Sequence, residues 1–422
     1  MAVSGAAPTR AAPSAWRVVW WFGFVSLAAD MVYEGARSVY GPLLAALGAS
    51  AVVVGLVTGA GEAVALVLRL AFGPIADRTG RYWSLTIVGY GLTAACVPLL
   101  ALAPRLGAAG IAFAATMILL ERLGKAVRSP SKSALLAHVA AAVGRGRGFG
   151  VHKALDQVGA FAGPLLVAGV VGVASLWWGM AVLAVPGAIA MVLLLTLRRR
   201  VPDPGVYDEQ PIVADDAPAE RRGWWAEAVG AGLSGDFFRY AVAASLTTGA
   251  LVTFGIIGYH LTVEGLVPVA AVPVVYAAAM AVEALAALLV GSVYDRTGTR
   301  VLLLVPVLVA LVPALALGSA LVAVLAGVVA WGFAQGVQDS TVKAVVADLV
   351  EAPRRATAYG VFAGIQGMFA IVGGVGAGWL YERSLLALVV VVALTQVLAL
   401  ALLVDTFRKG AVRRSARLRR AG

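Results

Sequence analysis

The sequence predicts an all-α integral membrane protein whose twelve transmembrane helices form two pseudo-symmetric halves of six. Hydrophobic residues make up 61% of the 422 residues and charged residues only 13%, with a mean hydropathy of +0.91. Soluble domains, in contrast, carry about 25% charged residues. Apolar stretches of roughly 20 residues, long enough to cross a hydrocarbon core as helices, recur from end to end. A charged motif also occurs twice, once in each half of the chain.

The expected spans set the organisation of the chain. An even number of spans places both termini on one side of the membrane, and the basic C-terminal tail makes that side cytoplasmic by the positive-inside rule. We expect the spans at residues 17–43, 51–72, 83–103, 109–139, 149–171, 174–197, 235–260, 266–291, 300–318, 320–350, 357–380 and 384–405.

The polar segments divide the chain into five parts. The longest of them, 198–234, contains prolines and charges of both signs, and we interpret it as a cytoplasmic linker because it is too short for an enzymatic domain. The predicted parts are a cytoplasmic N-terminal segment at 1–16, a six-helix half at 17–197, this linker, a second six-helix half at 235–405 and a basic cytoplasmic tail at 406–422.

A repeated charged motif follows the second and the eighth span. Each copy reads G-x-x-x-D-R-T-G with an arginine shortly afterwards, and the copies lie 218 positions apart. Glycine allows a tight turn where a side chain would clash, and Asp and Arg supply charges that pair or cap helix ends. Both copies are predicted as tight, charged loops at a membrane face, formed by Gly73, Asp77, Arg78, Gly80 and Arg81 in the first and by Gly291, Asp295, Arg296, Gly298 and Arg300 in the second.

The two loops resemble the signature loop of the major facilitator superfamily, between helices 2 and 3, and its echo between helices 8 and 9. A second internal match, of Ser129–Val151 onto Asp339–Val361, supports the duplication. The resemblance covers Trp16–Thr406 and implies a secondary transporter of the bacterial inner membrane that works by alternating access around a midplane site. It also implies that Asp77 and Asp295 act as cytoplasmic latches, meeting helix N-termini or arginines when the inner gate is closed.

The fourth span carries a stripe of charges. Glu121, Lys125, Arg128 and Lys132 are spaced four, three and four positions apart, which places them within an arc of roughly 60° on a helix. Facing lipid they would cost on the order of 10–14 kcal/mol, so the stripe must face a wet cavity or the protein interior. The alternative is a solvated helix end, which we expect for Lys132 but not for Lys125 and Arg128. Arg122 matches an arginine that recurs on helix 4 of the family, and the resemblance implies a part in proton coupling or substrate contact.

Acidic residues form a second group, on the first, second and eighth spans. Asp30 and Glu34 lie one turn apart and share a helix face with Arg37. Two carboxylates beside a cation suit a proton carrier, and a neutralised internal pair of Glu34 with Arg37 explains the pattern equally well. Glu62 and Glu283 are single acids in apolar spans, so each is either a proton site or a partner for the basic residues of the fourth span.

Small residues and a proline mark the fifth span. Gly159, Gly163 and Pro164 resemble the helix-5 antiporter motif of drug/proton exchangers, which implies export, whereas close packing of helices through small residues explains them without it. Lys153 and Asp156 on the same span are spaced to pair, and we interpret them as a structural contact at the cytoplasmic gate.

The tenth span is less basic than the fourth. Gln338 and Asp339 occupy the positions that correspond to Arg128 and Ser129, and Asp339 is also spaced to neutralise Lys343. We expect Gln338 and Asp339 to line the substrate or proton pathway opposite the charges of the fourth span.

These features predict a secondary active transporter of a small solute, with protons as the coupling ion. They leave the direction of transport open between import and export. The basic face of the fourth span favours an organic anion or zwitterion as substrate, and the fifth-span motif favours efflux of a lipophilic drug. A non-transporting membrane sensor or scaffold of the same fold is the alternative from another class.

The sequence gives little support to other classes. The basic clusters flank the spans, as orientation signals do, so nucleic acid is not an expected partner. Three scattered histidines (138, 152 and 260) and the single Cys96 offer no metal cluster or catalytic nucleophile, and no Walker-type loop is present, so neither an enzyme nor a cofactor is expected. The expected partners are the solute, protons and the lipid bilayer, with the protein acting as a monomer.

Overall fold

The computed structural model describes residues 13–207, 233–350 and 355–421. Within these ranges, the side chains outside the description are those at 145, 291–292, 294–297, 339–344, 347–348, 355–356 and 409–421. Four predicted site residues, Gly291, Asp295, Arg296 and Asp339, lie in that group. Most of the predicted N-terminal segment and linker lies outside the described backbone.

The described residues confirm the predicted membrane architecture. Within them, eleven helical stretches are long and apolar enough to cross a membrane. One of these, Tyr82–Ala141, contains two passes, because the chain turns at Gly107, whose φ of 54° and ψ of −125° are not helical. The twelve predicted passes are therefore present.

The first six passes form the N-terminal half. The first and the sixth pass are each built of two helices with a short break between them. In chain order the elements are α1 (Ala15–Arg37), α2 (Tyr40–Ala46), α3 (Ala51–Thr79), α4 (Tyr82–Leu99), η1 (Leu100–Ala109), α5 (Gly110–Ala141), α6 (Arg145–Val173), α7 (Leu176–Ala181) and α8 (Ala184–Arg200). The short helix η2 (Pro204–Tyr207) follows at the start of the linker.

The C-terminal half repeats this layout. Its first pass is again broken, between α10 and α11, as the first pass of the other half is broken between α1 and α2. Its elements are α10 (Gly235–Ala250), α11 (Phe254–Val263), η3 (Val269–Ala271), α12 (Val272–Thr297), η4 (Gly298–Leu303), α13 (Leu304–Ala316), α14 (Leu321–Leu349), α15 (Arg355–Arg383) and α16 (Leu385–Ala421).

Glycines with positive φ end equivalent helices of the two halves. Gly80 follows α3 with a φ of 62°, and Gly298 follows α12 with a φ of 65°. Gly48 and Gly265 likewise follow α2 and α11, with φ values of 81° and 62°. A residue with a side chain is strained in this region of φ, so glycine is favoured at each of these helix ends. The recurrence supports the internal duplication.

The first charged motif is mostly helical, which corrects the expectation of a loop. α3 continues through Gly73 and Asp77 to Thr79, and only Gly80 and Arg81 lie between α3 and α4. The helix can extend past the apolar span because its last turns are exposed to solvent. The backbone N–H of Gly80 bonds back into α3 and ends the helix there.

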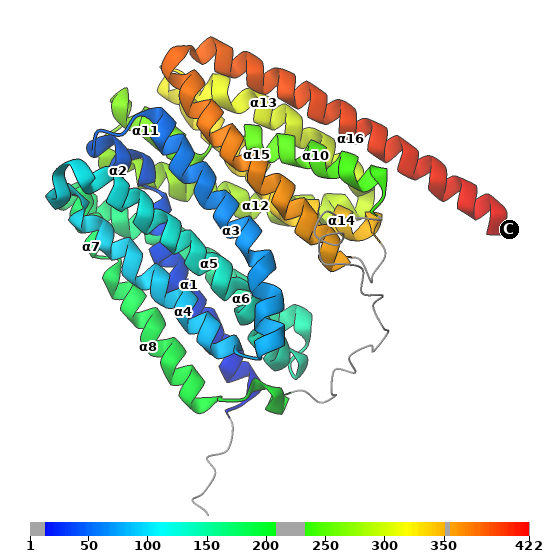
Figure 1. The fold of residues 1–422 in the computed structure, drawn as a ribbon, viewed down its shortest axis with the longest axis horizontal. Coiled ribbons are helices and arrows are strands. Elements are labelled where there is room, and N and C mark those ends of the chain that lie inside the picture. The colour runs from blue at the N-terminus through cyan, green and yellow to red at the C-terminus, as the bar shows by residue number, and fades with distance from the viewer. Residues whose placement is uncertain (1–12, 208–232, 351–354, 422) are drawn as a thin grey trace, which may run out of the picture.

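The two halves touch at one end of the molecule and diverge toward the other (Figure 1). We call the end with α2 and α11 the hairpin face, and the end where α1 begins and α8 ends the terminal face. At the hairpin side, α3 packs against α15, and α2 against α11. The approach is close because glycines meet: a Cβ on Gly374 would strike the backbone of Gly55, and a Cβ on Gly41 would strike the backbone of Gly255.

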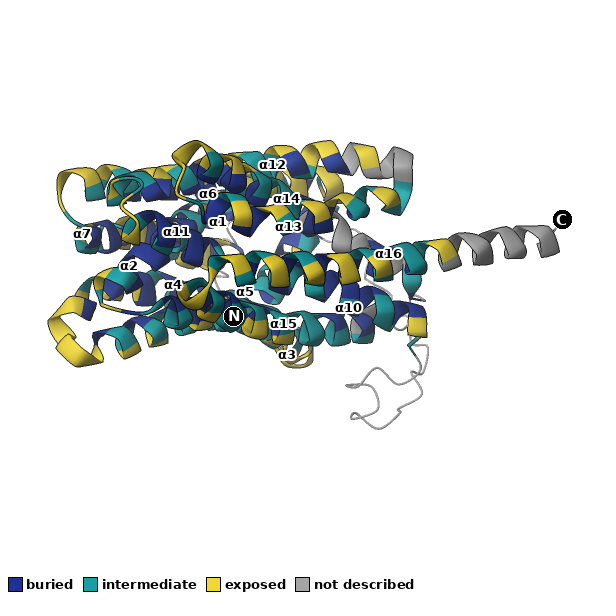
Figure 2. Ribbon diagram, turned by 90° about the horizontal axis from the view of Figure 1, so that it is seen from above, coloured by how far each residue is buried: buried dark blue, intermediate teal, exposed yellow. Residues whose placement is uncertain are grey.

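Large apolar side chains cover the outside of the molecule. Leu288, Val322 and Val397 are 75%, 81% and 65% exposed, and exposed residues follow the outer faces of the helices while buried ones face inward (Figure 2). Acyl chains of a bilayer would cover these side chains, as expected for a multi-pass membrane protein.

Candidate functional site

A cavity of about 410 Å³ lies between the two halves. Its walls come from α1, α3, α5 and α6 of the N-terminal half and from α10, α12, α14 and α15 of the C-terminal half. The α3–α15 contact separates it from the hairpin face, while its lining extends to Lys153 near the start of α6 at the terminal-face side. Of the predicted site residues, eight line this cavity: Asp30, Glu34, Arg37, Glu62, Lys125, Arg128, Glu283 and Gln338.

The α5 stripe faces the cavity through three basic residues. Lys125, Arg128 and Lys132 all line it. Arg128 donates a hydrogen bond to the Thr93 hydroxyl and lies 3.9 Å from Oδ1 of Asp30. The expectation that Lys132 lies at a solvated helix end is wrong, because α1 and α6 cover that part of α5.

Glu121 and Arg122 turn away from the cavity and into the N-terminal half. Arg122 is 2% exposed, donates a hydrogen bond to the Tyr33 hydroxyl, and lies 3.5 Å from Oε1 of Glu62. Glu121 is fully buried, with Oε2 at 3.7 Å from Nε of Arg122. Arg122 therefore contacts two residues that line the cavity, Tyr33 and Glu62, without lining the cavity itself.

The acidic residues of α1 and α3 form an ion-pair network with Arg37. Nη2 of Arg37 lies 2.9 Å from Oε1 of Glu62, and Nη1 lies 3.7 Å from Oε2 of Glu34. For Glu34 and for Glu62 the sequence left open a proton site or an ion pair. The structure contains both ion pairs: Glu34 contacts Arg37, and Glu62 contacts Arg122 of α5. The Tyr276 hydroxyl of α12 also donates to Oε2 of Glu34 at 2.5 Å, so this network is tied to the other half.

Lys125 contacts an aromatic ring in the cavity wall rather than a carboxylate. Its Nζ lies 3.7 Å from the centroid of the Tyr33 ring, a cation–π contact. Among the described side chains, Lys125 and Lys132 form no ion pair with a carboxylate, whereas Arg37, Arg128 and Lys153 each do. Lys132 donates a hydrogen bond to the Ser26 hydroxyl instead. The Lys125 ammonium is therefore available to an anionic group in the cavity.

A second acidic pair lies beside α5. Asp30 on α1 and Asp156 on α6 both line the cavity, and their carboxyl groups are close enough to interact electrostatically. Asp156 also accepts from the Ser26 hydroxyl at 2.8 Å and from Nζ of Lys153 at 3.1 Å. Two neighbouring carboxylates repel each other and one proton relieves that repulsion, so the pair is suited to hold a single proton. From its spacing to Lys153, Asp156 was interpreted as a structural residue, and its proximity to Asp30 was not predicted.

The C-terminal wall of the cavity is largely uncharged. The Thr248 hydroxyl donates to Oε1 of Gln338 at 2.7 Å and accepts from Nε2 of Gln366 at 3.0 Å. Trp331 lines the cavity next to them, and its indole N–H donates to the Val252 carbonyl at 2.8 Å. Glu283 is the acidic side chain that this half contributes among the described lining residues. Thr248 and Gln366 were not found from the sequence, because single uncharged residues in apolar helices give no periodic signal.

The two remaining motifs have structural contacts. In the first charged motif, Oδ1 of Asp77 accepts from the Tyr82 hydroxyl at 3.0 Å, and among the described residues no ion pair joins this motif to the other half. On α6, a Cβ at Gly159 or Gly163 would strike the backbone of α1, and Pro164 lies inside the helix. Both glycines therefore permit close packing of α6 on α1, the non-functional alternative for this motif.

The comparisons with known proteins agree with this architecture. The family model described as Major Facilitator Superfamily matches residues 22–317 and 237–421. The uncharacterized protein Rv2265 of Mycobacterium tuberculosis is 49% identical over 405 residues, which cover 96% of this chain and 96% of that protein. The uncharacterized MFS-type transporter MJ1317 of Methanocaldococcus jannaschii is 28% identical over 148 residues, covering 35% of this chain and 36% of that protein. A solved structure of the nucleoside transporter NupG shares the fold, with a TM-score of 0.75 and 15% identity over 92% of this chain and 100% of that one.

Proposed function

The chain belongs to the Major Facilitator Superfamily and is a multi-pass membrane transporter rather than an enzyme, and from this premise we propose that it moves a small organic anion or zwitterion through the central cavity, driven by protons. The anionic group binds Lys125, and the rest of the solute contacts the uncharged wall of the C-terminal half.

The observation that carries this proposal is the position of Lys125. It lines the cavity over the Tyr33 ring without a carboxylate partner among the described side chains. A cation held in a partly desolvated site is stabilised when an anion arrives, because a hydrogen bond to a charged group contributes about 1.5–3 kcal/mol. The amides of Gln338 and Gln366 and the ring of Trp331 offer neutral hydrogen bonds and an apolar surface to the remainder of the solute.

Proton coupling is supported by the Asp30–Asp156 pair. The pair lies on the wall of the same cavity, next to Arg128 and Lys132. Taking up or releasing its shared proton changes the local charge by one unit close to the α5 stripe. An anionic solute on that stripe and a proton on the acidic pair therefore stabilise each other, which links the two fluxes.

The arrangement of the halves supports alternating access. They are in contact on the hairpin side and apart toward the terminal face, where the charged motifs lie. We propose that rocking of the halves opens the hairpin face and brings Asp77 and Asp295 into latch contacts at the terminal face, which is cytoplasmic by the positive-inside rule.

The test is solute flux into proteoliposomes that contain the purified protein, with a panel of a carboxylate, an amino acid, a lipophilic cation and a neutral solute. Lys125→Gln is expected to lower kcat/KM for the anionic or zwitterionic solute by at least tenfold, corresponding to about 1.5 kcal/mol or more. Lys125→Arg keeps the charge and should retain most of the flux. Arg105→Gln, an exposed arginine at the hairpin face, is the matched charge control.

Two outcomes would contradict the substrate assignment. Transport of the lipophilic cation alone, unaffected by Lys125→Gln, would indicate drug efflux. The absence of flux for every solute would indicate a sensor or scaffold, provided that a thermal transition shows the protein to be folded.

Coupling is tested separately with Asp30→Asn. This variant should lose accumulation driven by an imposed pH gradient but retain solute counterflow, in which no net proton movement is required. Accumulation at the wild-type level would show that the Asp30–Asp156 pair does not carry the coupled proton.

A further inference from the structure

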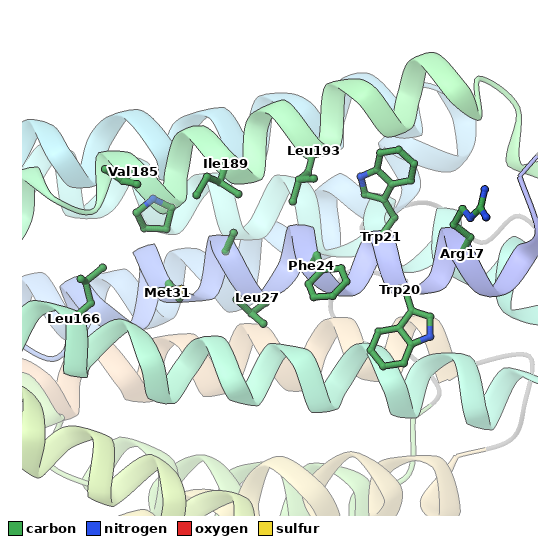
Figure 3. A pocket seen from close by; sticks show the side chains of 12 residues that line it. Arg17, Trp20, Trp21, Phe24, Leu27, Met31, Leu166, Val185, Ile189 and Leu193 are labelled. Atoms are coloured by element: carbon green, nitrogen blue, oxygen red, sulfur yellow. The ribbon is translucent and has the colours of Figure 1, made fainter.

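A groove on the outer surface of the N-terminal half is separate from the transport cavity. α6 and α8 both pack against α1, and the groove lies over α1 between them (Figure 3). Its volume is about 520 Å³, within the range of roughly 300–1,000 Å³ that is typical of ligand sites. Among the described residues, it shares no lining residue with the central cavity.

The groove is apolar along most of its length. Trp20 and Phe24 of α1 and Ile189 of α8 are 46%, 47% and 49% exposed at its rim. It runs along α1 from Arg17 to Met31, which is about 21 Å at 1.5 Å per residue. One leaflet contributes roughly 15 Å of hydrocarbon, half of the core, so one acyl chain fits along the groove with its headgroup at one end.

The end of the groove at the terminal face is basic. Arg17 is the charged residue of its described lining, and Arg200, at the end of α8, holds its guanidinium carbon 5.3 Å from the Trp21 ring centroid. Neither arginine forms an ion pair with a described carboxylate. Trp20 and Trp21 lie beside Arg17 (Figure 3), as tryptophans do at the level of lipid headgroups.

We propose that this groove is a binding site for one anionic phospholipid of the terminal-face leaflet. An acyl chain lies over α1 between α6 and α8, and the phosphodiester contacts Arg17 and Arg200. The apolar length and the two cations at the headgroup level are complementary to an anionic lipid and less so to a zwitterionic one, because the latter brings its own cation. The site does not depend on which solute the protein transports.

The proposal is tested by native mass spectrometry of the delipidated protein, mixed with equal amounts of phosphatidylglycerol and phosphatidylcholine. One phosphatidylglycerol is expected to remain bound to the wild type in preference to phosphatidylcholine. Each arginine near the membrane surface is expected to contribute about fivefold, so the double variant Arg17→Gln/Arg200→Gln should lower this preference by roughly 25-fold. The control is Arg147→Gln/Arg408→Gln, which removes two other exposed arginines from the terminal face and should leave the preference unchanged.

A second variant tests the apolar part without changing charge. Ile189→Trp fills the groove from the α8 side and should abolish binding of the lipid while its thermal transition in lipid-free detergent stays that of the wild type. Equal retention of the two lipids by the wild type would overturn the proposal, as would equal losses in the two double-arginine variants. A dimer in lipid-free detergent that Ile189→Trp dissociates would assign the groove to a second copy of the chain instead.

Discussion

The contact between α3 and α15 predicts that a single substitution can open the hairpin face. A Cβ built on Gly374 meets the carbonyl oxygen of Gly55 and lies 3.0 Å from Cα of Gly59. Both are backbone atoms and cannot rotate away, so Gly374→Leu forces the two helices apart. Gly376→Leu, two positions further along α15, is the matched control, because a Cβ there meets no atom within 4 Å.

The size of the effect follows from the cost of overpacking. Forcing extra methylenes into a closely packed contact costs about 1–3 kcal/mol. This cost applies only to the conformer in which α3 and α15 touch. At about 1.4 kcal/mol per factor of ten, the ratio of closed to open hairpin face should fall by roughly 5- to 150-fold.

Electron–electron distance measurements between spin labels can detect this shift. The buried Cys96 is replaced by alanine, and labels are placed at Ala46 on α2 and Val263 on α11, which are exposed at the hairpin face. A second pair, at Arg199 and Arg408, reports on the terminal face. In Gly374→Leu the first distance should lengthen and the second should shorten, while Gly376→Leu should behave as the parent protein.

The result that would refute the reasoning is an unchanged distance at the hairpin face in Gly374→Leu. This result refutes the reasoning only if Gly374→Leu is folded. A thermal transition within a few degrees of that of Gly376→Leu would establish that it is. Lengthening in both variants would also refute it, since Gly376→Leu introduces no steric conflict.

Two further predictions concern the ties within and between the halves. Tyr276→Phe removes the donor that holds Glu34 across the halves while keeping the ring against Phe254, so the ratio of closed to open hairpin face should fall about tenfold in the same spin-label assay. An unchanged ratio would show that the bond does not hold the halves together. Gly80→Ala places a side chain at a φ of 62° and should lower the free energy of unfolding by roughly 1–2 kcal/mol in a thermal melt. The control is Gly364→Ala within α15, which should not lower it because a Cβ there meets no neighbour. Equal melting temperatures of these two alanine variants would argue against strain at Gly80.

The fold could be predicted from the sequence because a bilayer leaves few choices. Apolar stretches of the length of α3 or α14 must be helices in lipid. The repeated motif, after the second and the eighth span, indicated that the helices form two halves. The boundaries were less predictable where a helix continues beyond the membrane. α3 extends through Asp77 to Thr79, since a helix can project into solvent and hydropathy does not record that projection.

The candidate site could be predicted only in part: the sequence indicated its charged residues but not its uncharged ones or the contacts between them. Lys125, Arg128 and Glu62 were found because burying a charge is costly, so a charge in an apolar helix points to a cavity or a partner. The partners themselves depend on tertiary packing: Tyr276 meets Glu34 across 242 positions of sequence, and Lys132 is covered by α1 and α6. Neither contact leaves a signal in local spacing, and Gln366 carries no charge that would attract notice.

The unequal distribution of charge between the two cavity walls has a consequence for how such a protein can diversify. Ionic chemistry is concentrated in one repeat, on α1, α3, α5 and α6, while the opposite repeat presents mainly amides and aromatic rings through Gln338, Gln366 and Trp331. If the proposed proton coupling holds, substitutions on the neutral repeat would change which solute shapes the cavity accepts while leaving the charged groups of the other repeat in place. Exchanging α14 and α15 between relatives is therefore a direct way to test whether the neutral repeat sets selectivity.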